Sequence, residues 1–359
     1  MVICMCTRGC AHRPTTSQVL YKLILLKNDS MADNSSCHEK SLILIPVYED
    51  WKALHRLLPL LDQELSTNRL RADILVVDDG SSEVSFLPEK AKCFRSIEAI
   101  DILSLRRNVG HQRAIAVGLS YLEANQACYR VVVMDCDGED NPGDVPRLIR
   151  ECSAHQDQKI IFAARTRRSE SLSFKAFYHI YRLIHFLLTG VRVQVGNFSV
   201  IPAVVLRRVV VVSELWNHYA AAVYKAKLPI ALIPVQRHCR LEGSSRMNLV
   251  ALVVHGLSAM AVFGDRIGVR LLMLVSLGMS LVGLALIGVI GIRFLTPLAI
   301  PGWATYVTGI LLVILIQMLI IVLVFAFVIL AGRDTVSFIP SRDYIHMADG
   351  VRRVYGSGQ

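Results

Sequence analysis

The stretch Val131-Val132-Val133-Met134-Asp135-Cys136-Asp137 decides the fold that we expect for this chain. Its apolar residues indicate a short buried strand, and two carboxylates follow at spacing i, i+2. Residues two apart on an extended segment point to the same side, so Asp135 and Asp137 can hold a hard divalent cation where the strand ends. A strand-ending turn with two solvated acids is the alternative, and this motif alone does not decide between them.

Strands and helices alternate on both sides of this stretch. From residue 41 onward, apolar strands are followed by segments whose apolar residues have helical spacing. Strands are expected at 41–46, 72–77, 99–105, 129–134 and 160–163, and helices at 51–65 and 112–124. This order indicates a mostly parallel sheet covered by helices, with ligands bound outside the carboxyl ends of the strands.

Polar residues gather at those strand ends. The first strand is followed by Pro46, Tyr48 and Glu49, and the second by Asp78 and Asp79, so hydrogen-bond acceptors meet where the base and ribose of a nucleotide could bind. For either aspartate taken singly, an Asx-type turn that caps the strand is an equally good explanation. The third strand is followed by Arg106-Arg107-Asn108-Val109-Gly110-His111-Gln112 at the start of a helix. There Asn108, the backbone amides and the guanidinium groups favour a phosphate.

The composition points to a membrane protein with a large polar part. The chain has 359 residues, of which 53% are hydrophobic, with a mean hydropathy of +0.46 and a net charge of +10. This is too apolar for an ordinary soluble enzyme and too charged for a pure membrane bundle. Residues 271–292 and 303–332 carry no charge, and each run exceeds the roughly 20 residues that span a bilayer as helix. A buried hairpin in a soluble protein is the alternative, which Pro297 and Pro301 between the runs oppose.

Arginines flank the two runs and predict their orientation. They cluster before the first run and after the second, which places both ends in the cytoplasm. We therefore expect an integral protein of an inner or plasma membrane with its catalytic part in the cytoplasm. The scattered cysteines would stay reduced there. Residues 247–263 suit an interfacial helix beneath this part, although a core helix would show the same pattern.

The first 38 residues receive no function. They lack the apolar core of a signal peptide, and we expect a disordered or mis-assigned extension, with Met31 a plausible start. Cys4, Cys6, Cys10 and His12 could imitate a metal cluster, but no second pair lies nearby in the sequence.

Several of these motifs together resemble family 2 glycosyltransferases. Residues 46–49, 77–81, 107–110, 135–137 and 240–247 occur in the order seen in the polyprenyl-phosphate branch of that family, and the likeness extends over about 41–332. The resemblance implies a GT-A fold, a divalent Mg²⁺ or Mn²⁺ ion, and transfer of a sugar with inversion from a nucleotide-diphosphate sugar to a membrane polyprenyl phosphate. UDP is favoured as the nucleotide, and the product would serve cell-envelope glycans or lipid modification. No nucleic-acid partner is expected, and a homo-oligomer is left open.

The resemblance also assigns residues to the metal. In these enzymes the segment after the second aspartate usually reads Leu-Gln-Asp-Pro-Pro, and here it reads Gly138-Glu139-Asp140-Asn141-Pro142. Glu139 takes the place of the glutamine, so Asp135, Asp137 and Glu139 are the expected metal ligands. Cys136 replaces the usual alanine and is expected to serve packing.

Basic residues are assigned to the phosphates. The resemblance places Arg165 near the diphosphate, with a solvated basic face as the alternative. Arg240, Ser244 and Arg246 match an Arg-x-x-Gly-Ser-x-Lys pattern beside the membrane, where Arg246 departs from the common lysine. We expect Arg240 and Arg246 at the acceptor phosphate and Ser244 among the binding residues. Because a phosphate monoester is already an anion, no dedicated general base is expected.

The expected domain order follows from these assignments. The extension at 1–38 precedes a GT-A domain at 39–240, an interfacial segment at 241–265, two transmembrane helices at 266–333 and a cytoplasmic tail at 334–359. Two other functions stay open. A processive polysaccharide synthase would be expected to carry more spans and a Gln-x-x-Arg-Trp element, and an inactive membrane scaffold would not need the intact Asp135, Asp137 and Arg240.

Overall fold

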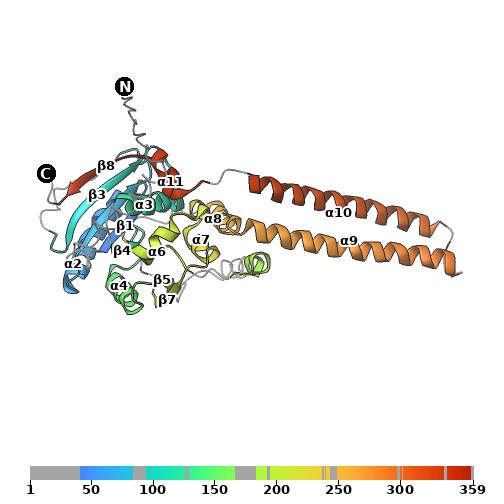
Figure 1. The fold of residues 1–359 in the computed structure, drawn as a ribbon, viewed down its shortest axis with the longest axis horizontal. Helices are drawn as coiled ribbons and strands as arrows, with labels where there is room; N and C mark the ends of the chain where they lie inside the picture. The colour runs from blue at the N-terminus through green and yellow to red at the C-terminus, as the bar shows by residue number, and fades with distance from the viewer. Residues whose placement is uncertain are drawn as a thin grey trace, which may run out of the picture. The chain divides into compact units, whose positions relative to one another are not determined.

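The fold of this chain is given by a computed structural model (Figure 1). The structure describes residues 41–83, 94–125, 129–165, 183–191, 195–236, 238, 240–242, 249–296, 300, 302–334 and 338–356. The N-terminal extension and its cysteine cluster lie outside the described residues.

A mixed sheet forms the centre of the fold. Within the described residues it has eight strands in the order β7-β5-β6-β4-β1-β2-β3-β8. The strands are β1 Ser41–Val47, β2 Ala72–Asp78, β3 Ile97–Leu105, β4 Arg130–Val133, β5 Ile160–Arg165, β6 Ser199–Pro202, β7 Ile230–Val235 and β8 Ala348–Tyr355. Pairing is parallel between β1, β2, β3 and β4 and between β5 and β7, and antiparallel at β6 and β8. The prediction of a GT-A-type α/β domain is confirmed.

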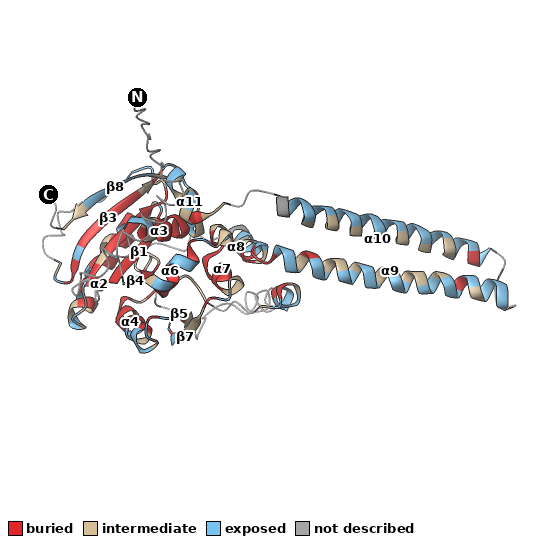
Figure 2. Ribbon diagram, in the orientation of Figure 1, coloured by how far each residue is buried: buried red, intermediate tan, exposed pale blue. Residues whose placement is uncertain are grey.

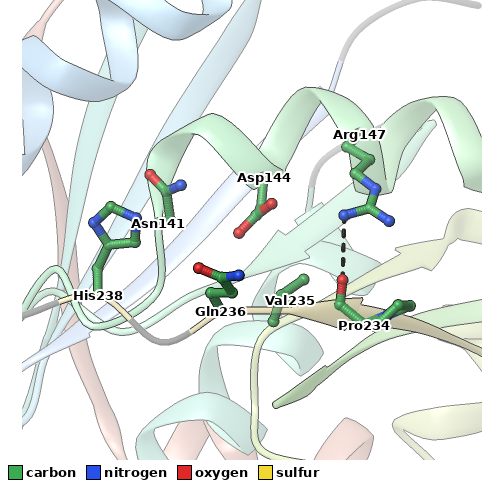
Figure 3. A pocket seen from close by; sticks show the side chains of 7 residues that line it. All are labelled: Asn141, Asp144, Arg147, Pro234, Val235, Gln236 and His238. Carbon is green, nitrogen blue, oxygen red and sulfur yellow. Dashed lines mark hydrogen bonds between the residues drawn. The ribbon is translucent and has the colours of Figure 1, made fainter. Parts of the chain in front are cut away.

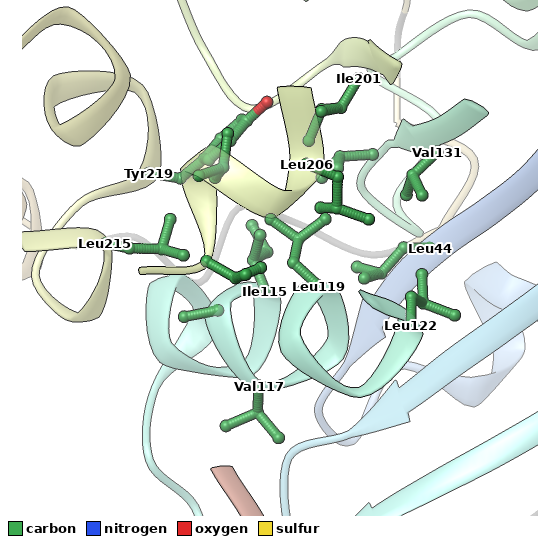
Figure 4. Close-up of a cluster of buried hydrophobic side chains, with 14 of the residues drawn as sticks. Leu44, Ile115, Val117, Leu119, Leu122, Val131, Ile201, Leu206, Leu215 and Tyr219 are labelled. Carbon is green, nitrogen blue, oxygen red and sulfur yellow. The ribbon is translucent and has the colours of Figure 1, made fainter. Parts of the chain in front are cut away.

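Helices cover both faces of this sheet because alternate strand residues are apolar on both sides. Leu42 and Leu44 of β1 belong to one buried cluster with α3 (His111–Asn125), α6 (Ala203–Val209) and α7 (Tyr219–Lys225) (Figure 4). Ile43 and Ile45 belong to a second cluster with α2 (Trp51–Thr67) and α4 (Val145–Ala154). A strand buried on both faces reads as a continuous apolar run, which is why the sequence predicted β1 to β4 within about two residues.

The two apolar runs form long helices. They are α9 (Gly264–Leu295) and α10 (Trp303–Asp334), preceded by α8 (Leu249–Ala261). Both are long and apolar enough to cross a membrane, and none of the most apolar window of either is buried in the protein. Figure 2 shows exposed and intermediate residues along both helices. They pack on each other, since a Cβ at Gly278 of α9 would lie 2.5 Å from Met318 Cε of α10.

The segment after α10, where a cytoplasmic tail was expected, contributes a strand to the sheet. It contains α11 (Pro340–Asp343) and then β8, which pairs antiparallel with β3. Arg353 donates from Nε and Nη2 to the two carboxylate oxygens of Asp101, at 2.8 and 3.1 Å. The sequence did not predict this strand because an edge strand has no periodic signal of its own. Strand β8 pairs with the edge of β3 that would otherwise be open.

Candidate active site

The parallel strands bring their following loops to one edge of the sheet. The loops after β1, β2, β3, β4 and β7 therefore lie near one another. The sequence predicted this for β1 to β4 but not for β7. Pro46 is buried within β1, whereas Tyr48 directly after that strand is 47% exposed.

The loops after β1 and β2 are held together by hydrogen bonds. Glu49 accepts from both the backbone amide and the hydroxyl of Ser82 at 2.7 Å, and the Glu49 amide donates to Ser81 Oγ at 3.0 Å. Asp78 Oδ1 accepts from the Ser81 amide at 3.2 Å. Burial raises the pKa of Asp78, and Ser81 opposes that shift.

Asp79 fixes the loop that follows β3. Its carboxylate is almost fully buried and accepts from the amides of Val109 and Gly110 at 2.7 and 2.9 Å. Gly80 has a φ of +74°, and a Cβ there would lie 2.6 Å from the Asn108 amide nitrogen. Asp79 therefore shapes the start of α3, whereas Asn108 is exposed at the site edge.

The carboxylate of Asp137 faces the guanidinium group of Arg240, which follows strand β7. Arg240 Nη2 is 3.2 Å from Asp137 Oδ2 and 3.5 Å from Asp50 Oδ2. Burial raises the pKa of the Asp137 carboxyl, the nearby charges of Asp135 and Glu139 raise it further, and the guanidinium of Arg240 opposes them. This is an acidic position that favours a bound cation.

The chain segment after β7 is fastened beside the Asp137 turn. Leu241 donates its amide to the Asp137 carbonyl at 2.9 Å and accepts at its own carbonyl from Arg56 Nη1 at 3.2 Å. Gly138 has a φ of +80°, and a Cβ there would lie 2.3 Å from Leu241 Cγ. A larger side chain at this position would meet Leu241, and the positive φ also favours glycine here.

Asp135 has a different partner, which the sequence analysis did not identify. His111 Nε2 lies 3.1 Å from Asp135 Oδ1, and Asn197 Nδ2 lies 2.9 Å from the same nitrogen. Gln112 donates to Asn197 Oδ1 at 3.0 Å and accepts from the Tyr219 amide at 2.8 Å. Burial lowers the pKa of the His111 imidazole, but Asp135 and the neighbouring carboxylates outweigh it and raise the pKa above its usual value.

The carboxylates of Asp135, Asp137 and Glu139 are chemically suitable ligands for a hard cation. They are not arranged as a three-ligand metal site. Carboxylate oxygens are the ligands that Mg²⁺ and Mn²⁺ accept, and crowding already raises the pKa of Asp137. The described residues contain no group of three or more His, Cys, Asp or Glu side chains placed to hold a metal. Asp135 pairs with His111 and Asp137 with Arg240, so the metal-binding roles of Asp135, Asp137 and Glu139 stay predictions.

A polar pocket adjoins this edge (Figure 3). It measures about 400 Å³ and is connected to the Asp137 turn through the His238 amide, which donates to the Glu139 carbonyl at 3.1 Å. Arg147 closes one end by donating from Nη1 to the Pro234 carbonyl at 3.2 Å. The lining residues are Asn141, Asp144, Arg147, Pro234, Val235, Gln236 and His238. Amides, a carboxylate and an imidazole suit the hydroxyl groups of a sugar.

Three predicted residues are less well placed by the structure. Arg165 ends β5 opposite Val235 of β7, so its backbone reaches the site edge. Ser244 and Arg246 lie outside the described residues, and their roles stay predictions. The sequence missed Asp50 and His111, although both stand beside residues that it did identify; Asn197 gave no local signal.

Comparison with models of protein families gives a match for part of this chain. Residues 42–215 match the model of glycosyl transferase family 2. The chain carries a glycosyl transferase family 2 domain. The matched residues contain β1 to β6 with Asp78, Asp135 and Asp137, whereas Arg240 and the long helices follow them. The predicted resemblance to this family is confirmed, and the domain is that of a glycosyltransferase.

Two individual glycosyltransferases are also similar to this chain. An uncharacterized glycosyltransferase, YkcC, of Bacillus subtilis (strain 168) is 24% identical over 294 residues, covering 78% of this chain and 87% of the relative. The undecaprenyl-phosphate 4-deoxy-4-formamido-L-arabinose transferase of Klebsiella pneumoniae (strain 342) is 30% identical over 140 residues, covering 38% of this chain. That match spans only 40% of the transferase's own length.

Among solved structures, glucosyl-3-phosphoglycerate synthase from Mycobacterium tuberculosis, in complex with Mn²⁺, UDP-glucose and phosphoglyceric acid, is similar to this chain. The identity is 13% and the TM-score 0.45, over 64% of this chain and 80% of the synthase. Its ligands are those of the synthase.

Proposed function

We propose that this protein transfers a sugar from a nucleotide-diphosphate sugar, with UDP favoured, to a polyprenyl phosphate in the membrane. The observation that carries the proposal is the pairing of Arg240 with Asp137 at the ligand-binding edge, a few residues before α8 and the two long helices. At this position the guanidinium group of Arg240 can contact one phosphate-bearing substrate, and the carboxylate of Asp137 can bind the cation that holds the other. The named activity of the Klebsiella pneumoniae relative supports a polyprenyl phosphate as the acceptor.

Each part of the edge has a task in this reaction. Tyr48, Glu49, Asp78 and Asn108 bind the nucleotide, and Asp79 holds the loop that carries Asn108. Asp135 and Asp137 would hold a divalent cation, which would neutralise negative charge on the leaving diphosphate. Arg240 then attracts the acceptor phosphate, held in place by its contacts with Asp50 and Asp137.

The acceptor needs no proton removed from it. A phosphate monoester carries about 1.5 to 2 negative charges at neutral pH, and its oxygen can attack the anomeric carbon directly. The main work of the protein is to bring two anions together, so cationic side chains matter more than a general base. Arg165 and Arg246 are proposed to complete this cationic lining.

Helices α9 and α10 both connect to the sheet domain, which supports placing the whole domain on one side of the membrane. β7 precedes α9 and β8 follows α10, yet both strands belong to the same sheet (Figure 1). The two long helices therefore form a hairpin whose ends return to one domain. With arginines at those ends, we propose that the domain lies in the cytoplasm, at an inner or plasma membrane.

A donor and acceptor screen tests the proposal. The purified full chain is incubated with radiolabelled UDP-sugars and GDP-sugars, a short polyprenyl phosphate, and either Mg²⁺, Mn²⁺ or a chelator, and the lipid product is read by mass spectrometry. We expect one sugar-phosphate lipid that requires the cation. A polymer that grows without lipid phosphate would favour the processive synthase, and no donor consumption under any condition would favour the inactive scaffold.

A further inference from the structure

A second cavity lies where the sheet domain meets the bases of the long helices. It measures about 750 Å³. One end is polar, with Glu214 after α6 and Lys225 at the end of α7, together with Asp265 in the first turn of α9. The other end is apolar, with Leu271 of α9 and Ile329 of α10. We call it the interfacial cavity.

Among the described residues that line the polar end, two carboxylates and one ammonium group are charged. Lys225 Nζ lies 2.7 Å from Glu214 Oε1 and 3.7 Å from Asp265 Oδ2. Burial raises the pKa of Glu214, but hydrogen bonding to Lys225 outweighs it, so the pKa is lowered and this group is a carboxylate at neutral pH. Two carboxylates thus face one ammonium, and the Asp265 side chain is 70% exposed. This end can accept a further cationic group, while Lys225 can contact an anion.

The length of α9 along the cavity is comparable to the thickness of the headgroup layer of a membrane. From Asp265 to Leu271 is six residues of α9, or about 9 Å at 1.5 Å per residue. The headgroup layer on one side of a bilayer is about 5 to 7 Å thick, which is half the difference between the total and hydrocarbon thickness. A molecule with its head beside Asp265 therefore reaches the hydrocarbon layer at Leu271, after passing Ile329, which lies beside Gly268.

Taken together, these features fit a particular class of ligand. We propose that the interfacial cavity binds one membrane phospholipid whose headgroup carries a primary ammonium, as phosphatidylethanolamine does. The ammonium donates to Glu214 and Asp265, the phosphate contacts Lys225, and an acyl chain lies against Leu271 and Ile329. A quaternary ammonium cannot donate hydrogen bonds, and a dianionic phosphate monoester would meet two carboxylates, so phosphatidylcholine and the sugar acceptor both fit less well.

Native mass spectrometry of the purified full chain tests this site without any sugar donor. Phosphatidylethanolamine, phosphatidylcholine and phosphatidylglycerol with identical acyl chains are added at equal concentration, and retained lipid is counted. We expect one retained phosphatidylethanolamine, bound about tenfold more tightly than phosphatidylcholine. Equal retention of the three lipids would overturn the proposal, as would displacement of the bound lipid by a short polyprenyl phosphate.

Matched variants locate the lipid. Ile329→Trp fills the cavity, whereas Ile320→Trp adds the same group to an exposed position of the same helix. We expect Ile329→Trp to lose the retained lipid and Ile320→Trp to keep it; equal retention overturns the assignment. If Ile329→Trp does not fold, Leu271→Trp fills the cavity from α9, with Leu281→Trp as its control.

The charge of the headgroup site is tested separately. Asp265→Asn should reduce the preference for phosphatidylethanolamine over phosphatidylcholine at least severalfold while a lipid is still retained. An unchanged preference would contradict the headgroup contact. Because the readout is lipid retention, a chain that transfers no sugar can still show this selectivity, so failure of the proposed function and failure of this site are distinguishable.

Discussion

Arg240 Nη2 lies 3.2 Å from Asp137 Oδ2, which joins the loop after β7 to the turn after β4. The side chains are 19% and 16% exposed, so the contact is largely shielded from bulk water. The backbone reinforces it, since Leu241 donates its amide to the Asp137 carbonyl. The proposed anion-binding arginine and the proposed metal ligand therefore cannot move independently.

Replacing Asp137 tests the proposed cation site. Asp137→Asn removes one ligand charge and keeps the shape of the side chain, so we expect transfer to fall by about 100-fold or more, with little change in thermal stability. Initial rates over a Mn²⁺ or Mg²⁺ titration measure this. Asp349→Asn on exposed β8 is the control and should leave both quantities unchanged. Wild-type turnover of Asp137→Asn at saturating metal would remove Asp137 from the site.

Replacing Arg240 separates the acceptor from the donor. Loss of a charge-assisted contact costs about 1.5 to 3 kcal/mol, so Arg240→Ala should raise the KM for polyprenyl phosphate by about 10-fold to 150-fold. Arg240→Lys should lose less because the charge is kept. Separate titrations of donor and acceptor give the two constants. A raised donor constant with an unchanged acceptor constant would show that Arg240 binds the diphosphate instead.

The Gly138 position tests how closely Leu241 must approach. Gly138→Ala should displace Leu241 and with it Arg240, because the new Cβ would lie 2.3 Å from Leu241 Cγ. We expect lower activity with acceptor KM most affected. In Gly138→Ala/Leu241→Ala the clash is absent, and acceptor KM should recover in part, leaving about 1 kcal/mol of backbone strain from the positive φ. No recovery would mean that strain alone causes the loss.

A buried ion pair away from the site predicts a pH dependence of stability. Arg130 donates from Nε and Nη2 to Asp157, each side chain being 11% exposed. Burial raises the pKa of Asp157, but hydrogen bonds from Arg130 and Tyr129 outweigh it and lower the pKa below 3.8. The stabilisation is therefore present above pH 3.8 and is lost as pH falls through the lowered value.

Asp157→Asn checks that sign. Removing one partner of a buried pair costs about 3 to 5 kcal/mol, so the variant should unfold at a clearly lower temperature at pH 7. The difference from wild type should shrink as pH falls through the lowered pKa of the wild-type carboxyl. Thermal unfolding from pH 8 downward through the acid range measures it, with Asp349→Asn as the control. A difference that grows on acidification would contradict the assignment.

The last strand predicts a dependence of the sheet on the segment after the membrane helices. Deleting 348–359 leaves the β3 edge unpaired and removes the contact of Tyr355 with Phe94, whose rings lie 5.1 Å apart. We expect a lower unfolding temperature and aggregation. Deleting only 357–359 is the control. Equal stability and solubility of the two truncated chains would show that β8 is dispensable.

Local patterns in the sequence are enough to predict several elements of this protein. Strands β1 to β4, helix α2 and the two long helices follow from periodicity and apolar length, which act over a few neighbouring residues. The placement of Asp78, Asp135 and Asp137 at one edge follows as well, because parallel strands end on the same side. The resemblance then led to the family 2 domain.

The contacts between distant segments, in contrast, depend on how the whole chain folds. Arg353 and Asp101 are 252 positions apart, and no periodicity links an edge strand to its partner. Asn197 reaches His111 from 86 positions away, so its part in the site had no local sign. The same holds for Arg240 beside Asp137 and for the cavity between α7, α9 and α10. Such contacts depend on the path of the whole chain in the folded state. Patterns among neighbouring residues do not reveal that path.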